Sequence, residues 1–101
     1  MKLLTKALRK QLRPLQATEA EEDPLIICKF FYPDFSWTWY AIEFDGENIF
    51  YGFVDGDFPE LGYFSLAELQ ANHGQWGLPI ERDRFFKPCR LSTLRAQIDR
   101  E

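Results

Sequence analysis

Two hydrophobic runs separated by Asp45-Gly46 constrain the fold of this chain more than any other feature. The runs are SWTWYAIEF and ENIFYGFV, and both are rich in the aromatic and β-branched residues that favour strands. Asp-Gly is a strong signal for a two-residue hairpin turn, because both central positions of a type I′ turn need positive φ. The sequence therefore predicts an antiparallel hairpin with Asp45 and Gly46 at its tip.

The two-residue turn also predicts a register for the hairpin. Counting back from the turn pairs Tyr40 with Tyr51 and Trp39 with Gly52. One face should then be almost wholly apolar and form the main core face. Its residues are Phe44, Ile42, Tyr40, Ile49, Tyr51 and Phe53. The opposite face should carry Trp37 and Trp39, with the Trp39 ring covering the vacancy at Gly52.

Helical patterns flank the predicted strands. Leucines four residues apart in LLTKALRKQLRPL predict a short amphipathic helix with a basic outer face, too short to anchor the chain to a membrane by itself. Ser65 and Glu68 form a capping-box pattern that predicts a second helix. Ser92 is expected to cap a last helix that ends near Ile98. Between these helices, an additional strand is expected at residues 83–87.

The predicted fold class is α+β: an antiparallel meander of three to four strands from Leu25 to Phe64, packed with a short N-terminal helix and C-terminal helices. A chain of 101 residues with 46% hydrophobic residues predicts a single domain over residues 1–101, since two cores would each be too small. Cys28 and Cys89 are expected to be reduced and structural, and no cofactor is expected. The sequence has neither a secretory signal nor a run long enough to span a bilayer, which predicts a cytoplasmic protein with no membrane partner.

Acidic residues are concentrated in the middle of the chain. Residues 1–13 carry a net charge of +5, residues 14–80 carry −11, and residues 81–101 carry +2. In one interpretation, the basic ends pack beside the acidic sheet and neutralise it; in the other, an exposed acidic surface attracts a basic partner. Direct binding to nucleic acid is not expected, because it needs bases interleaved with aromatic rings, and the aromatic segment has almost no Lys or Arg.

Five phrases of the sequence together resemble the bacterial family of domains of unknown function numbered 2958. They are LLTKALRKQL, KFFYPDFSWTWYAIEF, FYGFVDG, ELGYFSLAELQ and GLPIERDRFFKP. The resemblance runs from about Lys2 to Ser92. Members of this family are small proteins often encoded on plasmids and integrative elements, near DNA-processing and antirestriction genes. The family has no agreed activity, so the resemblance implies no catalytic or ligand residues.

Asp55, Asp57 and Glu60 have the oxygen ligands that Ca²⁺ prefers, but the other acids of a calcium loop and its closing bidentate Glu are missing. The expected role of this segment, DGDFPELG at residues 55–62, is a turn-rich loop. His73 is the only histidine and is expected in a surface loop, so no metal site is predicted.

A small carboxylate-dependent hydrolase is the alternative function. Its acids would be Glu43 with Glu81 or Asp83 near the tryptophan face, although no spacing in the sequence places them together. A single Glu43→Gln or Asp83→Asn change should abolish such an activity. A binding protein should tolerate these changes and fail instead when the charge of an exposed surface is reversed.

The favoured function is non-enzymatic binding of a protein partner with a basic surface, as part of a mobile element's interference with host DNA-processing or defence proteins. The candidate partner-binding residues are Trp37, Trp39, Asp34, Glu43, Asp55, Asp57 and Glu60. Two interpretations of the tryptophans stay open. Either both rings are buried in the core beneath residues 78–86, or Trp37 stands at the rim of an open aromatic and acidic patch.

Overall fold

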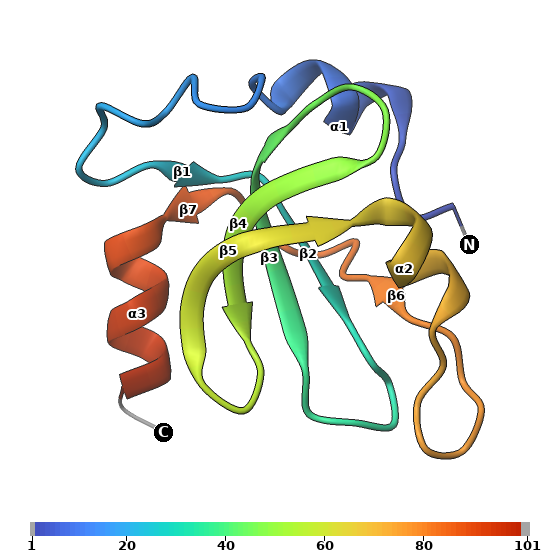
Figure 1. Cartoon of the computed structure of the whole chain (residues 1–101). Helices are drawn as coiled ribbons and strands as arrows, with labels where there is room; N and C mark the ends of the chain where they lie inside the picture. The colour runs from blue at the N-terminus through green and yellow to red at the C-terminus, as the bar shows by residue number, and fades with distance from the viewer. Residues whose placement is uncertain (1, 100–101) are drawn as a thin grey trace.

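The computed structural model describes residues 2–99 and has a five-stranded antiparallel sheet at its centre (Figure 1). The strand order is β5-β4-β3-β2-β6, so four consecutive strands form a meander and β6 returns to pair with β2. The strands are β2 (Cys28–Phe31), β3 (Thr38–Phe44), β4 (Ile49–Asp55), β5 (Pro59–Ser65) and β6 (Glu81–Arg82). The predicted α+β class, with its antiparallel meander, is confirmed.

Within residues 2–99, a small second sheet and three helices complete the fold. In the second sheet, β1 (Leu25–Ile26) pairs antiparallel with β7 (Cys89–Arg90). The helices are α1 (Lys6–Gln11), α2 (Leu66–Ala71) and α3 (Leu91–Asp99). The chain therefore returns at its C-terminal end to pair with the segment that precedes the meander (Figure 1).

The turn between β3 and β4 is longer than the predicted one. The Asp45 amide donates a hydrogen bond to the Ile49 carbonyl at 2.9 Å, so that Gly46, Glu47 and Asn48 form the loop. The carboxylate of Asp45 accepts hydrogen bonds from the amides of Glu47, Asn48 and Ile49 at 2.7–3.0 Å. Gly46 has a φ of +92°, whereas Asp45 is not among the residues with positive φ. Asp45 therefore caps the loop with its side chain instead of opening a type I′ turn, and the predicted register is wrong.

The observed register pairs Tyr40 with Phe53 and Trp39 with Val54. It differs from the prediction by two residues over this part of the hairpin, and an even shift keeps each side chain on its predicted face. Trp39 and Tyr40 therefore lie on opposite faces as predicted, but Trp39 does not lie across from Gly52. Gly52 is required for another reason, because a Cβ there would lie 1.9 Å from the Tyr40 carbonyl oxygen.

A bulge in β3 changes the faces near the turn. The register shifts between Ala41 and Glu43, so Ile42 is an extra residue without an opposite partner. The bulge turns Phe44 onto the face that carries Phe50, and the two rings lie with their centroids 4.5 Å apart. The prediction that Phe44 shares a face with Ile42 is therefore wrong.

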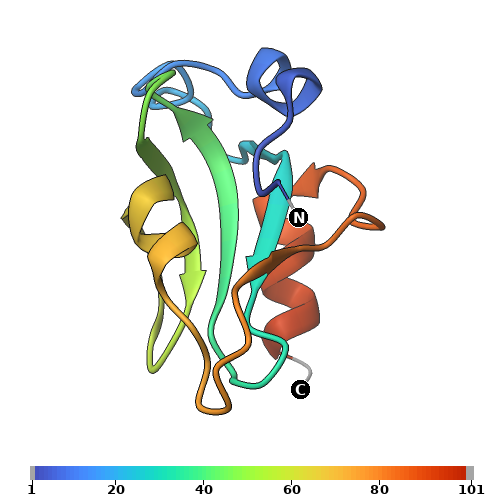
Figure 2. The ribbon, with the colours of Figure 1, turned by 90° about the vertical axis from the view of Figure 1, so that its right-hand side faces the viewer.

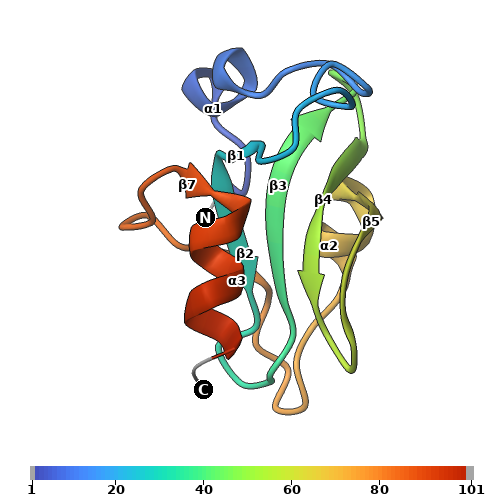
Figure 3. The same ribbon diagram turned by 90° about the vertical axis from the view of Figure 1, so that its left-hand side faces the viewer.

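Both faces of the sheet are buried, and each has its own core. The first core includes Trp39, Phe44, Phe50 and Phe64 with Leu66 and Leu69 of α2. The second includes Tyr40, Ile42 and Phe53 with Leu91 and Leu94 of α3. Helices α2 and α3 consequently cover opposite sides of the sheet, as the two side views show (Figures 2 and 3).

The starts of α2 and α3 use different capping residues. Ser65 caps α2, since its hydroxyl oxygen accepts a hydrogen bond from the Glu68 amide at 3.1 Å, which confirms the Ser65 half of the predicted capping box. The prediction that Ser92 caps α3 is wrong, because the helix already begins at Leu91. The cap comes from Asp23, whose carboxylate accepts from the Ser92 amide at 2.8 Å and from the Ser92 hydroxyl at 2.6 Å. These hydrogen bonds hold the pKa of Asp23 below its usual value.

Two stretches differ from their predicted secondary structure. Residues 59–62, predicted as loop, form the first half of β5. Residues 83–87, predicted as a strand, contain a turn in which the Phe85 amide donates to the Asp83 carboxylate at 2.9 Å. The strand of this region is β6, immediately before the turn.

Candidate functional site: an acidic, aromatic groove

A groove of about 660 Å³ opens on the side of the sheet that carries α2. Its floor comes from β3, β4 and β5, and its rim comes from α2 and from the loops that join β2 to β3 and β4 to β5. Most of its lining is aromatic. The aromatic residues are Tyr32, Phe35, Trp37, Trp39, Phe58, Phe64 and Tyr63. The Tyr63 ring itself points to the other face of the sheet, where its centroid lies 5.2 Å from that of Tyr51. We call this feature the aromatic groove.

The two neighbouring tryptophans have different positions at the aromatic groove. Trp39 is only 7% exposed and belongs to the core, where its ring centroid lies 5.4 Å from that of Tyr32. Trp37 is half-buried, and its ring centroid lies 6.0 Å from that of Trp39. The Trp37 indole also lies against Gly56, where a Cβ would come within 2.8 Å of the ring. Trp39 is therefore a core residue, and Trp37 is a partly exposed side chain that lines the groove.

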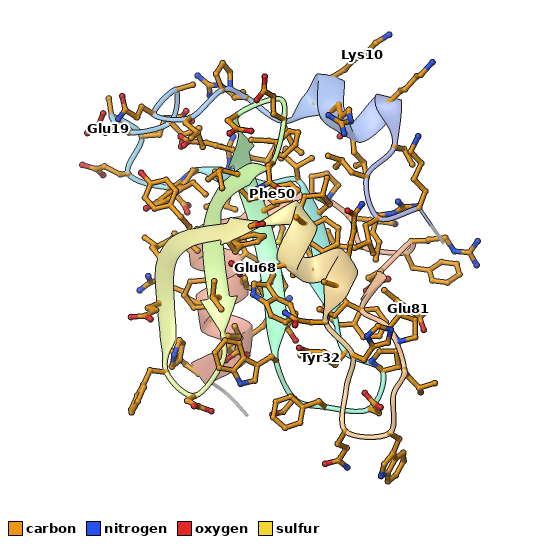
Figure 4. All side chains as sticks on the ribbon, turned by 45° about the vertical axis from the view of Figure 1, so that its right-hand side comes forward. Lys10, Glu19, Tyr32, Phe50, Glu68 and Glu81 are labelled. Atoms are coloured by element: carbon orange, nitrogen blue, oxygen red, sulfur yellow. The ribbon has the colours of Figure 1, made fainter. Side chains whose placement is uncertain are left out.

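Three carboxylates stand at the rim of the aromatic groove. Asp57, Glu60 and Glu68 line it and are exposed. No Lys or Arg occurs among the described residues that line it. Figure 4 shows Glu68 and Tyr32 on the same side of the sheet, and Lys10 of α1 at the opposite end of the molecule from Tyr32.

Other bases of the N-terminal segment have partners elsewhere. Arg13 contacts Glu21 at 2.5 Å, and Arg9 donates a hydrogen bond to the Gly46 carbonyl at 3.1 Å. These contacts lie around the β3–β4 turn and the loop that follows α1. The acids of the groove therefore do not depend on these two arginines for neutralisation.

One position in the floor of the groove has no side chain. Gly62 faces the groove from β5, and its cross-strand partner in β4 is also a glycine, Gly52. A Cβ on Gly62 would meet no atom within 4 Å, and the φ of Gly62 is not positive. At Gly62 the groove therefore exposes the backbone of β5, with no side chain over it.

Asp34 lies beside the groove and is not among its lining residues. Its Oδ2 accepts hydrogen bonds from the amides of Trp76 at 2.9 Å and Leu78 at 3.4 Å. Its Oδ1 is buried against Gly74 and has no hydrogen-bond partner among the residues that the structure describes. Asp34 thus joins the β2–β3 loop to the loop between α2 and β6.

Glu43 is buried, with 3% of its surface exposed, and lies outside the aromatic groove. One carboxylate oxygen accepts from the Gln16 amide at 2.8 Å, and the other accepts from the Thr18 amide at 2.8 Å and from the Thr18 hydroxyl. These contacts order the loop after α1, in which Gln16 adopts a φ of +73°. A carboxylate enclosed in this way has no free surface to offer a partner.

The structure brings four of the seven candidate residues together at the groove. These are Trp37, Trp39, Asp57 and Glu60. Asp34, Glu43 and Asp55 lie outside its lining; Asp55 ends β4 and pairs with Pro59. Sequence reasoning missed Tyr32, Phe35, Phe58, Tyr63 and Glu68. The aromatic cluster FFYPDFSW around a turn was the available signal for the first two, since turn residues with large rings rarely all enter a core.

The two cysteine thiols, Cys28 and Cys89, are not activated as nucleophiles. Burial raises the pKa of the Cys28 thiol to about 12 and also raises the pKa of Cys89. Both thiols are therefore protonated at neutral pH, where only a thiolate is a good nucleophile. Within residues 2–99, no three His, Cys, Asp or Glu side chains converge in a way that could hold a metal ion.

The fold and the groove define a small α+β protein with an acidic, aromatic site on one face of its sheet. The chain belongs to the family described as "Protein of unknown function (DUF2958)", whose model matches residues 3–100. No curated protein and no solved structure matches the chain. In the described part of the chain, every helix is too short or too polar to cross a membrane.

Proposed function

We propose that this protein is a non-enzymatic binding module whose aromatic groove receives a basic segment of a protein partner. The observation that carries the proposal is the composition of the groove: six aromatic rings and three carboxylates line it, with no Lys or Arg among its described lining residues. A cationic side chain gains from both groups. It is attracted to ring faces by about 0.5–2 kcal/mol, depending on how far it is desolvated, and it forms charge-assisted hydrogen bonds with carboxylates.

The charge of the groove also indicates which kind of partner it favours. Phosphate groups of a nucleic acid would be repelled by Asp57, Glu60 and Glu68, which favours a polypeptide partner over DNA or RNA. Basic surfaces that attract acidic grooves are common on proteins that themselves bind nucleic acid. The genomic setting expected from the family resemblance, close to DNA-processing and antirestriction genes, therefore favours a host DNA-processing or defence protein as the partner.

The hydrolase alternative receives no support from the contacts of Glu43 and Asp83, two of the three acids predicted for it. Both oxygens of Glu43 accept hydrogen bonds from the loop after α1. Asp83 lies 3.9 Å from the Lys29 ammonium and accepts from the Phe85 amide. The two carboxylates thus have separate partners in different parts of the fold, and we propose no second function.

The test compares two charge reversals that change the net charge by the same amount. Glu60→Lys alters the groove, and Glu47→Lys alters the exposed β3–β4 turn. Octa-lysine and octa-arginine serve as probes, with binding measured by calorimetry at moderate salt. The proposal expects binding at least tenfold weaker for Glu60→Lys and nearly unchanged for Glu47→Lys. Equal weakening in both variants would mean general charge attraction and would contradict the proposal, as would the absence of binding by the unaltered protein.

A further inference from the structure

Gly62 is the one glycine of the chain that nothing inside the protein explains. Gly46 and Gly77 have positive φ. At Gly52, Gly56 and Gly74, a Cβ would come within 3.0 Å of another atom. These account for five of the six glycines. Gly62 has neither property, since its φ is not positive and a Cβ there would meet open space.

A glycine in the middle of a strand weakens that strand, because it gives no side chain to the sheet and loses more backbone entropy on folding. Such a glycine often marks a place where a ligand or another chain comes close to the backbone. Gly62 lies at such a place, in the floor of the aromatic groove and next to Gly52 on β4. The backbone at Gly62 therefore faces open space in a groove that is also lined by carboxylates and aromatic rings.

We propose that the guanidinium group of a partner arginine lies flat over Gly62 in the aromatic groove. This inference rests on the proposed function and names the side chain that the groove selects. Glu60 is on the same face of β5, two residues from Gly62 and so about 7 Å along the strand, within reach of the head group of an arginine seated there. Trp37 supplies a partly exposed ring to the same groove.

The geometry favours arginine over lysine and over a neutral ring. A guanidinium is planar, weakly hydrated and able to stack on rings while pairing with a carboxylate through two hydrogen bonds. An ammonium is a compact, strongly hydrated charge that gains little from a flat surface. A neutral aromatic group would fit the space but would leave the carboxylates beside it without a cationic partner.

Three acetylated and amidated pentapeptides test the choice of side chain: Gly-Gly-Arg-Gly-Gly and the same peptide with lysine or citrulline at its centre. Citrulline keeps the shape of arginine without its charge. Binding is followed through the indole N–H signals in NMR spectra. Trp37 and Trp39 report on the groove, and Trp76, 78% exposed and outside the groove, is the internal control. The arginine peptide should shift the first two signals and leave the third, with affinity at least tenfold above citrulline and several-fold above lysine.

Two variants test the position. Gly62→Val places a branched side chain where the guanidinium would lie, while Leu61→Val changes the neighbouring residue, which points to the other face of the sheet. Gly62→Val should weaken binding of the arginine peptide at least tenfold and leave the melting temperature equal or higher, because valine suits a strand better than glycine. Leu61→Val should leave binding unchanged.

The outcomes separate this inference from the proposed function. If octa-lysine and octa-arginine bind equally well and Gly62→Val weakens the binding of neither, the proposed function holds, and the proposal that an arginine lies over Gly62 is wrong. If the citrulline peptide binds as well as the arginine peptide, the groove does not select a guanidinium group, and the inference is again wrong. If no basic peptide binds at all, the proposed function fails together with the inference.

Discussion

Glu43 accepts two hydrogen bonds from Thr18, one from its backbone amide at 2.8 Å and one from its hydroxyl group. The two residues are 25 positions apart, and both are buried. This contact, together with the hydrogen bond from the Gln16 amide, fixes the loop after α1 to the end of β3. The only buried acid of the described residues thus organises the fold, although the sequence suggested a role for it at the surface.

Replacing Glu43 by glutamine should destabilise the protein without changing its shape. The amide NH₂ of glutamine would face backbone donors that now point at a carboxylate, and buried donors left unpaired cost about 1–3 kcal/mol. We expect a loss near 2–3 kcal/mol in the free energy of unfolding, measured by denaturant titration. Glu47→Gln, at an exposed position, is the control and should change stability by less than about 0.5 kcal/mol. A Glu43→Gln protein as stable as the unaltered one would show that these hydrogen bonds contribute little.

The three tryptophans should respond differently to truncation. Trp39→Ala removes a core ring and should cost about 3–5 kcal/mol. Trp37→Ala removes a half-buried ring and should cost clearly less, while weakening the binding of basic peptides. Trp76→Ala should have almost no effect on stability, since the side chain is 78% exposed. Acrylamide quenching of the single-tryptophan variants gives an independent measure; strong quenching of Trp39 would contradict its place in the core.

Asp45 should make the stability of the β3–β4 turn depend on pH. Hydrogen bonds from the amides of Asn48, Glu47 and Ile49 lower the pKa of its carboxyl group below the usual 3.8. A group with a lowered folded-state pKa stabilises the protein above its unfolded-state pKa, and this contribution is lost as the pH falls through the folded-state pKa. Asp45→Asn should therefore lower the denaturant midpoint at pH 7, and the difference from the unaltered protein should shrink below about pH 4. A difference that stays constant down to pH 2 would argue against the cap.

Gly74→Ala should release the contact between Asp34 and the loop that precedes β6. An added Cβ would lie 1.4 Å from Asp34 Oδ1, so the carboxylate must move away. The amides of Trp76 and Leu78 would then lose their acceptor and should exchange hydrogen faster. Gly62→Ala is the matched control, because its Cβ meets open space, and it should leave the exchange of these amides unchanged. Unchanged exchange in Gly74→Ala would show that another acceptor replaces Asp34.

The sequence predicted the elements of the fold better than their registers. The β3–β4 hairpin, the cap at Ser65 and the opposite faces of Trp39 and Tyr40 all follow from local patterns, and the structure contains them. The bulge at Ile42 did not follow from any local pattern, because it depends on how Phe44 packs against Phe50 across the strands. Tertiary packing of this kind overrides a two-residue turn signal.

The groove was predictable only in part, for a related reason. Trp37, Trp39, Asp57 and Glu60 were proposed from their residue types, and they do line one groove. Their companions on β5 were hidden because residues 59–62 contain Pro59 and Gly62 and looked like a loop. Proline is tolerated here since it begins an edge strand. The arginine that we propose over Gly62 accounts for the glycine.

The late pairing of β6 and β7 has a consequence for the newly made chain. Strands β2 to β5 are joined by short connections and can form soon after they are synthesised. β2 gains its outer neighbour only when residues 81–82 have been made, and β1 gains its partner only with residues 89–90. Until then the outer edge of β2 is unpaired and can capture strands of other chains. During synthesis, the nascent protein should therefore be most prone to aggregation in the interval between completing the meander and adding its last strands.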